Sequence, residues 1–321
     1  MTVPEITTAA AILRAGGLVA MPTETVYGLG ADACNEAALR KVFSAKERPF
    51  DHPLIVHIAE LSQMNDWARE VPPTALRLAE AFWPGPLTLI LKKQPHVLDI
   101  VTGGQDTIGL RMPRHPVALA LLKAFGGGVA APSANKFTHI SPTTAAAVRE
   151  ELADKVDLIL DGGDCEVGLE STIVDLTGDV PVILRPGMIS AEALTNVIGI
   201  KTLVSRQENP IIRVPGMHHL HYAPVTKTLL MEMKDIPVFL QSLQINDLPA
   251  AVVTYHQLEG QQIKHIHHVQ LSNEAASYAH DLYRTLRELD NQKFKCIIVE
   301  AVPASSEWDA IRDRLSKASA G

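Results

Sequence analysis

Short apolar runs alternate with helical patterns over the first 200 residues of the chain. Brief apolar runs are typical of strands buried in a sheet, and apolar positions spaced by three or four are typical of helices. We predict helices at residues 35–45 and near 61–69, 73–82, 116–125, 143–152 and 190–197. We predict strands at residues 18–21, 54–58, 87–91, 108–112, 129–131, 156–160, 171–176 and 182–184. Residues 1–200 are therefore predicted to form an α/β domain with a large twisted mixed sheet flanked by helices.

The alternation stops at residues 201–225 and then resumes. This stretch holds Pro210, Pro215, Gly216 and Pro224 and has no hydrophobic period, so we predict a linker. Beyond it, predicted strands at 226–231, 251–255, 268–271 and 296–301 alternate with helices near 234–243, 273–290 and 307–318. Residues 226–321 are thus predicted to form a smaller Rossmann-like α/β domain. No G-x-G-x-x-G motif follows its first strand, which argues against a dinucleotide site there.

The composition agrees with two ordinary globular domains. The chain has 321 residues, of which 46% are hydrophobic and 20% charged. No apolar run reaches the roughly 18 residues of a membrane span, and the first ten residues do not resemble a secretory signal. The three cysteines, Cys34, Cys165 and Cys296, are widely spaced and fit a reducing compartment. We therefore expect a cytoplasmic location and no membrane association.

The formal net charge of −7 lies entirely in the first part of the chain. Residues 1–200 carry 16 Lys and Arg against 23 Asp and Glu, whereas residues 201–321 carry 13 of each kind. Non-specific binding to a phosphate backbone needs a basic excess. We therefore expect no stable direct binding of nucleic acid.

The histidines gather in two groups, His218, His219 and His221 in the linker and His265, His267 and His268 near a predicted strand. Either group could suggest a metal site. Histidine clusters without further ligands at metal-site spacing are more often solvated, so we assign no metal to them.

Two cations close the predicted helix 35–45. Lys46 and Arg48 are followed by Pro49, which forces the chain out of the helix. Cations at a helix C-terminus commonly do no more than interact with the helix dipole. Two cations fixed at one corner also suit a triphosphate, with lysine as a point charge and arginine as a planar fork.

Polar segments follow the predicted strands at several places. Residues 22–30 (PTETVYGLG) follow the first strand, and Ser133 and Asn135 follow the strand at 129–131. Ligands in open α/β sheets bind at such strand ends, although capped turns have the same composition. Ser141 begins a helix ahead of Pro142, which suits either a cap or a phosphate.

Arg111 lies inside an otherwise apolar strand. A charge in that place needs a partner, which would be either a structural carboxylate or the carboxylate of a substrate. Ser171 and Arg185 again place polar groups at strand ends.

These motifs occur together, in an order that resembles the YrdC-like family. The pairs Lys46-x-Arg48 and Ser133-x-Asn135 match that family's signature tetrad, and segments 22–30, 141–143, 170–172 and 185–187 match its other motifs. Segment 221–224 (HYAP) is similar to the linker motif of the long, two-domain form. The resemblance covers about residues 5–318, and segments 287–290 and 317–319 carry most of it in the C-terminal domain.

The resemblance implies a nucleotidyltransferase that makes L-threonylcarbamoyl-AMP, pyrophosphate and water from L-threonine, bicarbonate and ATP. The product would serve the threonylcarbamoyladenosine modification of tRNA, with downstream tRNA-modifying proteins as candidate partners. The implied catalytic residues are Lys46, Arg48, Ser133 and Asn135. The implied ATP-binding residues are the same four with Thr107, Ser141, Arg185 and Tyr222, and the implied threonine-binding residues are Thr23, His57, Arg111 and Ser171.

Further expectations concern the cofactor and the linker. Mg²⁺ is expected to enter with ATP, without a metal site made by protein alone and without an organic cofactor. Because Tyr222 lies in the linker, the linker at 201–225 is expected to cover the active site.

Two other functions have less support in the sequence. An RNA-binding module of the YrdC-like fold would need a basic face with interleaved aromatics, and aromatics are only 5% of the chain. A carbamoyltransferase of hydrogenase maturation would bring zinc-finger-like modules, and the sequence has no Cys-x-x-Cys pair.

Overall fold

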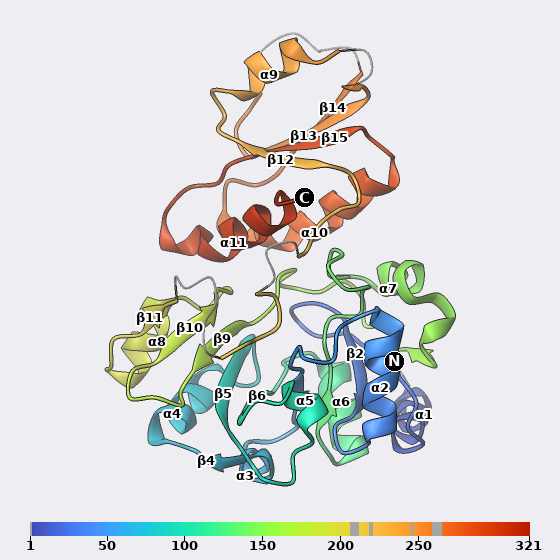
Figure 1. Cartoon of the computed structure of the whole chain (residues 1–321), viewed down its shortest axis with the longest axis vertical. Helices are drawn as coiled ribbons and strands as arrows, with labels where there is room; N and C mark the ends of the chain where they lie inside the picture. The colour runs from blue at the N-terminus through green and yellow to red at the C-terminus, as the bar shows by residue number, and fades with distance from the viewer. Residues whose placement is uncertain (1, 206–211, 218–220, 245–246, 259–264) are drawn as a thin grey trace. The chain divides into compact units, whose positions relative to one another are not determined.

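The computed structural model describes residues 2–205, 212–217, 221–244, 247–258 and 265–321. The chain forms two compact units, which Figure 1 shows by colour. The N-terminal unit consists of Met1–Phe137 and Ser141–Met217, and the C-terminal unit of Thr138–Ile140 and His218–Gly321. A segment of three residues from the first half of the chain thus belongs to the C-terminal unit.

The N-terminal unit is built on a mixed sheet, as the sequence predicts. Its main strand order is β11-β10-β9-β5-β6-β3-β7-β2-β1-β8, and β4 pairs with β5. Neighbours β3 and β6 are parallel, while β5 and β6 are antiparallel. The strands are β1 (Val19–Met21), β2 (Gly28–Asp32), β3 (Ile55–His57), β4 (Ala68–Glu70), β5 (Leu87–Lys93), β6 (Thr107–Arg111), β7 (Val129–Ala130), β8 (Leu158–Ile159), β9 (Thr172–Asp175), β10 (Val182–Arg185) and β11 (Leu203–Val204).

Around β3, β5, β6 and β9 the two faces of this sheet carry apolar clusters of different size. Alternation along the strands places Val56, Leu89, Leu110 and Val174 on one face, in the largest apolar cluster of the unit. The opposite face carries a smaller apolar cluster formed by Ile55, Ile90, Ile173 and Val214.

Helices cover the sheet of the N-terminal unit (Figure 1). They are α1 (Val3–Arg14), α2 (Glu36–Lys46), α3 (Met64–Trp67), α4 (Pro73–Phe82), α5 (Asp99–Thr102), α6 (Pro116–Phe125), α7 (Ala145–Leu152) and α8 (Ala191–Ile198). Helix α2 begins as predicted at Asn35, whose side chain accepts a hydrogen bond from the backbone nitrogen of Ala38 at 3.2 Å.

The sequence reading was wrong at several places in this unit. It began a helix at Ser141 and Pro142, whereas α7 begins at Ala145 and is capped by Thr144, whose side chain accepts from the backbone nitrogen of Ala147 at 3.1 Å. It also gave the linker no regular element, whereas Leu203–Val204 form β11 beside β10. It missed α1, which starts with a capping box between Thr2 and Glu5. It extended a helix to residue 69, where the structure has a short helix followed by β4. It also read Gly30 as part of a loop, whereas Gly30 lies in β2. A Cβ atom there would lie 2.9 Å from Val129 Cγ1, so the close approach of β7 explains this glycine.

The C-terminal unit has a parallel sheet in the order β12-β15-β13-β14. Helix α9 (Ile236–Ser242) lies on one face, and α10 (Ala275–Asn291) and α11 (Asp309–Ala318) lie on the other (Figure 1). The strands are β12 (Thr228–Met231), β13 (Ala250–Thr254), β14 (Ile266–Gln270) and β15 (Cys296–Glu300). A parallel sheet covered on both faces agrees with the predicted α/β class.

The predicted linker is described only in part. Residues 206–211 and 218–220 lie outside the described residues, and with them His218 and His219 of the first histidine group. His221 is buried, with its ring centroid 4.1 Å from that of Tyr222. In the second group, His267 and His268 lie in β14 with exposed side chains.

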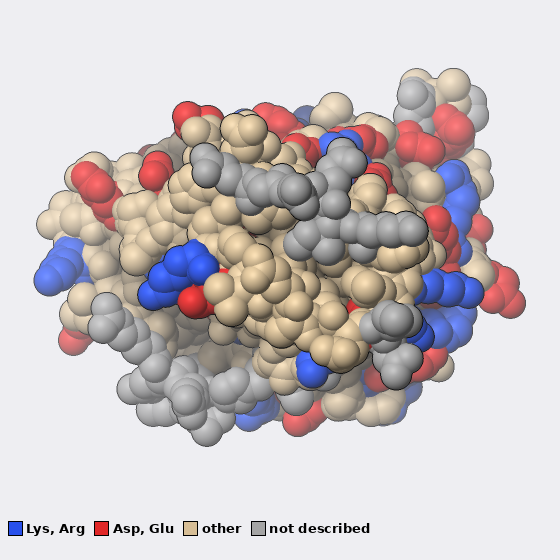
Figure 2. Space-filling model, turned by 90° about the horizontal axis from the view of Figure 1, so that it is seen from above, with Lys and Arg blue, Asp and Glu red and all other residues tan. Residues whose placement is uncertain are grey.

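Surface charge and helix length concern the expectations about nucleic acid and membranes. On the face shown in Figure 2, the described residues are mostly uncharged, and acidic and basic side chains are both scattered among them. Within the described ranges, no helix has the length and apolar character needed to cross a membrane.

Candidate active site

The motif segments of the N-terminal unit are joined by backbone hydrogen bonds. Tyr27, in segment 22–30, donates from its nitrogen to the carbonyl of Pro142 at 2.9 Å and accepts from the nitrogen of Ala134 at 2.8 Å. The carbonyl of Glu24 accepts from the nitrogen of Val167 at 2.7 Å. Loops from four parts of the sequence therefore meet at one place.

Three residues of the predicted tetrad are in direct contact. Lys46, the last residue of α2, is buried, and its Nζ donates to the carbonyl oxygens of Ser133 and Asn135. Burial, followed by the nearby charge of Arg48, holds the pKa of Lys46 well below its usual value. Carbonyl oxygens thus fix the side-chain nitrogen of Lys46 beside the Ser-x-Asn loop.

The backbone at the end of α2 directs Arg48 inward. Glu47 adopts a left-handed conformation with φ of 55°, and the nitrogen of Arg48 then donates to the carbonyl of Phe43 at 3.0 Å. The guanidinium of Arg48 is buried, and its Nη2 donates to the carbonyl of Pro53 at 2.8 Å. This second cation is held by the backbone rather than left at the surface.

A row of polar side chains crosses the less apolar face of the sheet. The register pairs His57 on β3 with Arg111 on β6, and places Ile55 beside Gly109. A Cβ atom at Gly109 would contact Ile55, Ile90 and Thr88 at 3.2–3.4 Å, which places Thr88 on that face too. Since alternate residues share a face, His57, Arg111 and Thr88 point to the same side.

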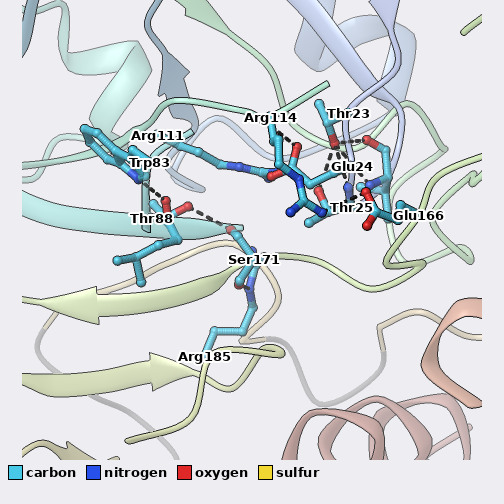
Figure 3. Close-up of polar contacts among 12 residues, drawn as sticks. Thr23, Glu24, Thr25, Trp83, Thr88, Arg111, Arg114, Glu166, Ser171 and Arg185 are labelled. Carbon is cyan, nitrogen blue, oxygen red and sulfur yellow. Dashed lines mark hydrogen bonds and ion pairs between the residues drawn. The ribbon is translucent and has the colours of Figure 1, made fainter. Parts of the chain in front are cut away.

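Glu24 joins this row as the partner of Arg111 (Figure 3). Its Oε1 accepts from Arg111 Nη2 at 2.7 Å, and its Oε2 accepts from the backbone nitrogen of Arg114 at 2.9 Å. Burial alone would raise the pKa of Glu24, but the charge and hydrogen bond of Arg111 lower it below its usual value. Arg111 therefore has the structural carboxylate that the sequence allowed as one of two alternatives.

Two nitrogen atoms in the row are buried without a hydrogen-bond partner among the described residues, Arg111 Nε and His57 Nδ1. Burial, followed by the charge of Arg111, lowers the pKa of His57 to about 3, so its ring is neutral at pH 7. Buried polar atoms are normally satisfied, and a pair that is not indicates a place for a ligand. The side chain of Arg111 has five N–H donors, and the hydrogen bond from its Nη2 to Glu24 uses one of them.

Ser171 connects the row to Arg185 (Figure 3). Its Oγ lies 2.8 Å from Thr88 Oγ1 and accepts from Arg185 Nη2 at 3.1 Å. Arg185, at the end of β10, also donates to the carbonyl of Pro215 at 3.1 Å. A residue expected to bind threonine and one expected to bind ATP are therefore in contact.

Ser141 is also held by a buried carboxylate. Its Oγ donates to Glu170 Oε1 at 2.5 Å, and both residues are buried. Glu170 directly precedes Ser171, so this hydrogen bond connects Ser141 to the Ser171 region.

The remaining predicted residues lie differently. Thr23 is buried next to Glu24, but its hydroxyl lies 2.6 Å from the carbonyl of Val26 and 2.8 Å from Thr25 Oγ1, within its own turn. Thr107 is the first residue of β6, four residues and about 13 Å of strand from Arg111. Tyr222 is buried in the C-terminal unit, where it packs on Tyr283.

Sequence reasoning missed Glu24, Thr88 and Glu170 as members of this network. Glu24 and Glu170 lie within recognised motifs, so an acidic residue next to a motif threonine or serine was an available signal. The sequence signal for Thr88 was weaker: it is a hydroxyl residue inside the apolar run at 87–91.

Comparison with known proteins finds matches over almost the whole chain. A family model described as "Telomere recombination" matches residues 11–187, and one described as "Threonylcarbamoyl-AMP synthase, C-terminal domain" matches residues 189–320. The threonylcarbamoyl-AMP synthase of Pyrococcus abyssi is 38% identical over 98% of this chain and 94% of its own. That of Bacillus subtilis is 41% identical over 99% and 94%. A crystal structure of P. abyssi Sua5 complexed with L-threonine superposes with a TM-score of 0.91 at 38% identity, covering 98% of this chain and 94% of the other.

Proposed function

Because this chain belongs to the threonylcarbamoyl-AMP synthase family, we propose that it makes L-threonylcarbamoyl-AMP from L-threonine, bicarbonate and ATP. The observation that carries the proposal is the Arg111–His57 pair, buried beside Glu24, in which one nitrogen of each residue has no hydrogen-bond partner in the part of the chain that the structure describes. A guanidinium with donors to spare suits an amino-acid carboxylate. The hydrogen-bonded loops bring the Lys46 cluster into the same unit.

The reaction has two bond-forming steps. The threonine amine forms an N–C bond with the carbon of bicarbonate, and water is lost as the carbamate forms. A carbamate oxygen then attacks the α-phosphorus of ATP, and the bond from that phosphorus to the bridging oxygen of pyrophosphate breaks. Both buried carboxylates near the site, Glu24 and Glu170, already accept hydrogen bonds. We therefore assign catalysis chiefly to positioning and charge neutralisation.

The residues divide into two groups by chemistry. Lys46 and Arg48 are the cations for the phosphates, with Ser133 and Asn135 in contact with Lys46. Family membership adds Ser141 as a further phosphate contact. Arg111 is the fork for the threonine carboxylate, with His57 and Ser171 on the same side of the sheet. Arg185, proposed for the nucleotide, contacts Ser171 of the threonine group.

Three expected contacts have less support in the geometry. Thr23 would have to exchange a bond within its turn to bind threonine. Family membership alone supports Thr107 as an ATP contact. Tyr222 and the linker are proposed to cover the site, again on family grounds.

Magnesium is proposed to reach the site with the triphosphate oxygens. The described residues contain no group of three or more His, Cys, Asp or Glu side chains that could hold a metal. When bound, the ion would neutralise charge on the leaving pyrophosphate. The residues above would hold the nucleotide and the carbamate.

Pyrophosphate release is the direct test of this function. We expect release to require threonine and bicarbonate together, and valine to be slower by about 10²-fold, because a site built for the hydroxyl would leave polar groups unpaired. Valine is the matched control, since it has the shape of threonine without the hydroxyl. Equal rates with valine, or release independent of bicarbonate, would refute the proposal.

A further inference from the structure

One face of α10 carries three residues with contacts outside the helix. Tyr283, Arg287 and Asp290 are spaced by four and three residues, so their side chains lie on the same side of the helix. Arg287 and Asp290 belong to the segment that carried the C-terminal resemblance, and the proposed reaction gives neither a role. Their contacts indicate one.

The first contacts hold the end of the linker. The carboxylate of Asp290 accepts from the backbone nitrogens of Val225 at 2.9 Å and Thr226 at 2.7 Å. The ring of Tyr283 stacks on that of Tyr222 at 5.9 Å between centroids. Tyr222 has a φ of 60°, a conformation that residues other than glycine seldom adopt and that surrounding contacts must maintain.

The second contact holds a segment from the first half of the chain. Arg287 Nη2 donates to the carbonyl oxygen of Ile140 at 2.7 Å. The nitrogen of Ala223 donates to the carbonyl of Thr138 at 3.0 Å, and His139 forms a parallel bridge with Ala223. These contacts explain why residues 138–140 belong to the C-terminal unit.

Residues 138–140 lie between two residues of the proposed ATP site, so the contact of Arg287 with Ile140 bears on that site. Thr138 follows Asn135 by three residues, and Ile140 directly precedes Ser141. Both flanking residues are assigned above to ATP. A hydrogen bond that fixes the Ile140 carbonyl therefore fixes the peptide unit that leads into Ser141.

We propose that Arg287 is a positioning residue for ATP, which acts through the backbone of Ile140 on the segment between Asn135 and Ser141. The C-terminal unit would thus serve the reaction by holding this segment and the linker on one face of α10. The inference rests on the proposed function for its reference to ATP.

The first test compares two arginines that each donate to a backbone carbonyl. Arg287→Met keeps the apolar stem and removes the bond to Ile140. Arg312→Met is the matched control, because Arg312 donates to the carbonyl of Pro303 at 2.8 Å within the C-terminal unit. We expect Arg287→Met to raise the KM for ATP by about 10-fold, as loss of a charge-assisted hydrogen bond does, and the KM for threonine by less than about 2-fold. Arg312→Met should change neither by more than about 2-fold.

Amide hydrogen exchange provides a second readout that needs no turnover. Residues 138–141 should exchange about 10-fold faster in Arg287→Met than in the wild type or in Arg312→Met. Unchanged exchange there, an unchanged KM for ATP, or equal increases in both KM values would each overturn the proposal. A wild-type enzyme that releases no pyrophosphate would instead refute the proposed function, and the exchange of residues 138–141 would still decide whether Arg287 holds the segment.

Discussion

The sheets of the two units differ in how they accommodate buried polar groups. In the C-terminal unit, Glu300 ends β15 with an exposed fraction of 1%, and its carboxylate accepts from the backbone nitrogens of Tyr255 and His256 and contacts His256 Nδ1 at 2.5 Å. In the N-terminal unit, Arg111 has an exposed fraction of 4%, yet its Nε has no partner among the described residues. Glu300 fixes its own loop, whereas Arg111 keeps donors available.

Strand position does not account for this difference. Ligands in open α/β sheets bind outside the carboxyl ends of strands, and both Glu300 and Arg111 lie at such ends. What distinguishes them is whether the protein itself satisfies the buried group. A neutral hydroxyl, that of Tyr278, is also buried without a described partner in the C-terminal unit, but a hydroxyl costs far less to bury than a charge.

The largest effect is expected at Lys46. Replacing Lys46 by Met should reduce turnover by about 10²-fold or more, because a preorganised cation beside the phosphates is lost. Pyrophosphate release at saturating substrates measures the effect. Lys41→Met is the matched control on the same helix, since Lys41 donates to the carbonyl of Gly16 at 2.7 Å outside the site. If Lys46→Met kept near wild-type turnover and its fold was intact by circular dichroism, Lys46 would only interact with the helix dipole and would have no role in phosphate binding.

A smaller and more selective effect is expected at Arg111. Replacing Arg111 by Lys keeps a charge near Glu24 but removes the planar fork, so the KM for threonine should rise by about 10- to 100-fold. The KM for ATP should change by less than about 2-fold. Initial rates at varied threonine and ATP separate the two constants.

Two further variants show whether this effect belongs to the site. Arg114→Lys changes a half-exposed arginine whose side chain pairs with Glu166, and both KM values should stay within about 2-fold of the wild type. Glu300→Gln should lower the free energy of unfolding of the C-terminal unit by about 1–3 kcal/mol without changing the KM for threonine. If Arg114→Lys raised that KM as much as Arg111→Lys, the assignment of Arg111 to the carboxylate would fail.

Apolar pattern predicted the parts of the fold that depend on local sequence. The strands at 54–58, 87–91 and 108–112 are confirmed, because short apolar runs bounded by turn residues are consistent with buried strands. Strand β2 was missed because it contains two glycines, which are unusual in strands. These glycines are needed because residues 129–131, distant in sequence, approach the strand closely. No local signal reports such an approach.

The sequence predicted which residues belong to the site better than it predicted which of them are in contact. The tetrad and Arg111 were found by residue type and spacing, and Lys46, Ser133 and Asn135 are in contact. The partner of Arg111 could not be chosen from sequence, because Glu24 is 87 residues away. The role of segment 138–140 was equally hidden, since its partners lie in the C-terminal unit.

The smallest effect concerns the pH dependence of stability. His57 titrates at about 3 in the folded N-terminal unit, against an ordinary value near 6.5. Between these values the unfolded chain binds a proton that the folded unit does not, so stability falls as pH decreases from about 6.5, by up to about 1.4 kcal/mol per pH unit. His57→Gln should have a smaller slope between pH 6.5 and 5, a range in which most carboxylates stay ionised. Urea unfolding in a Trp308→Phe background would follow Trp67 and Trp83 and hence the N-terminal unit alone. An identical slope in both proteins would mean that burial does not hold His57 neutral in the folded unit.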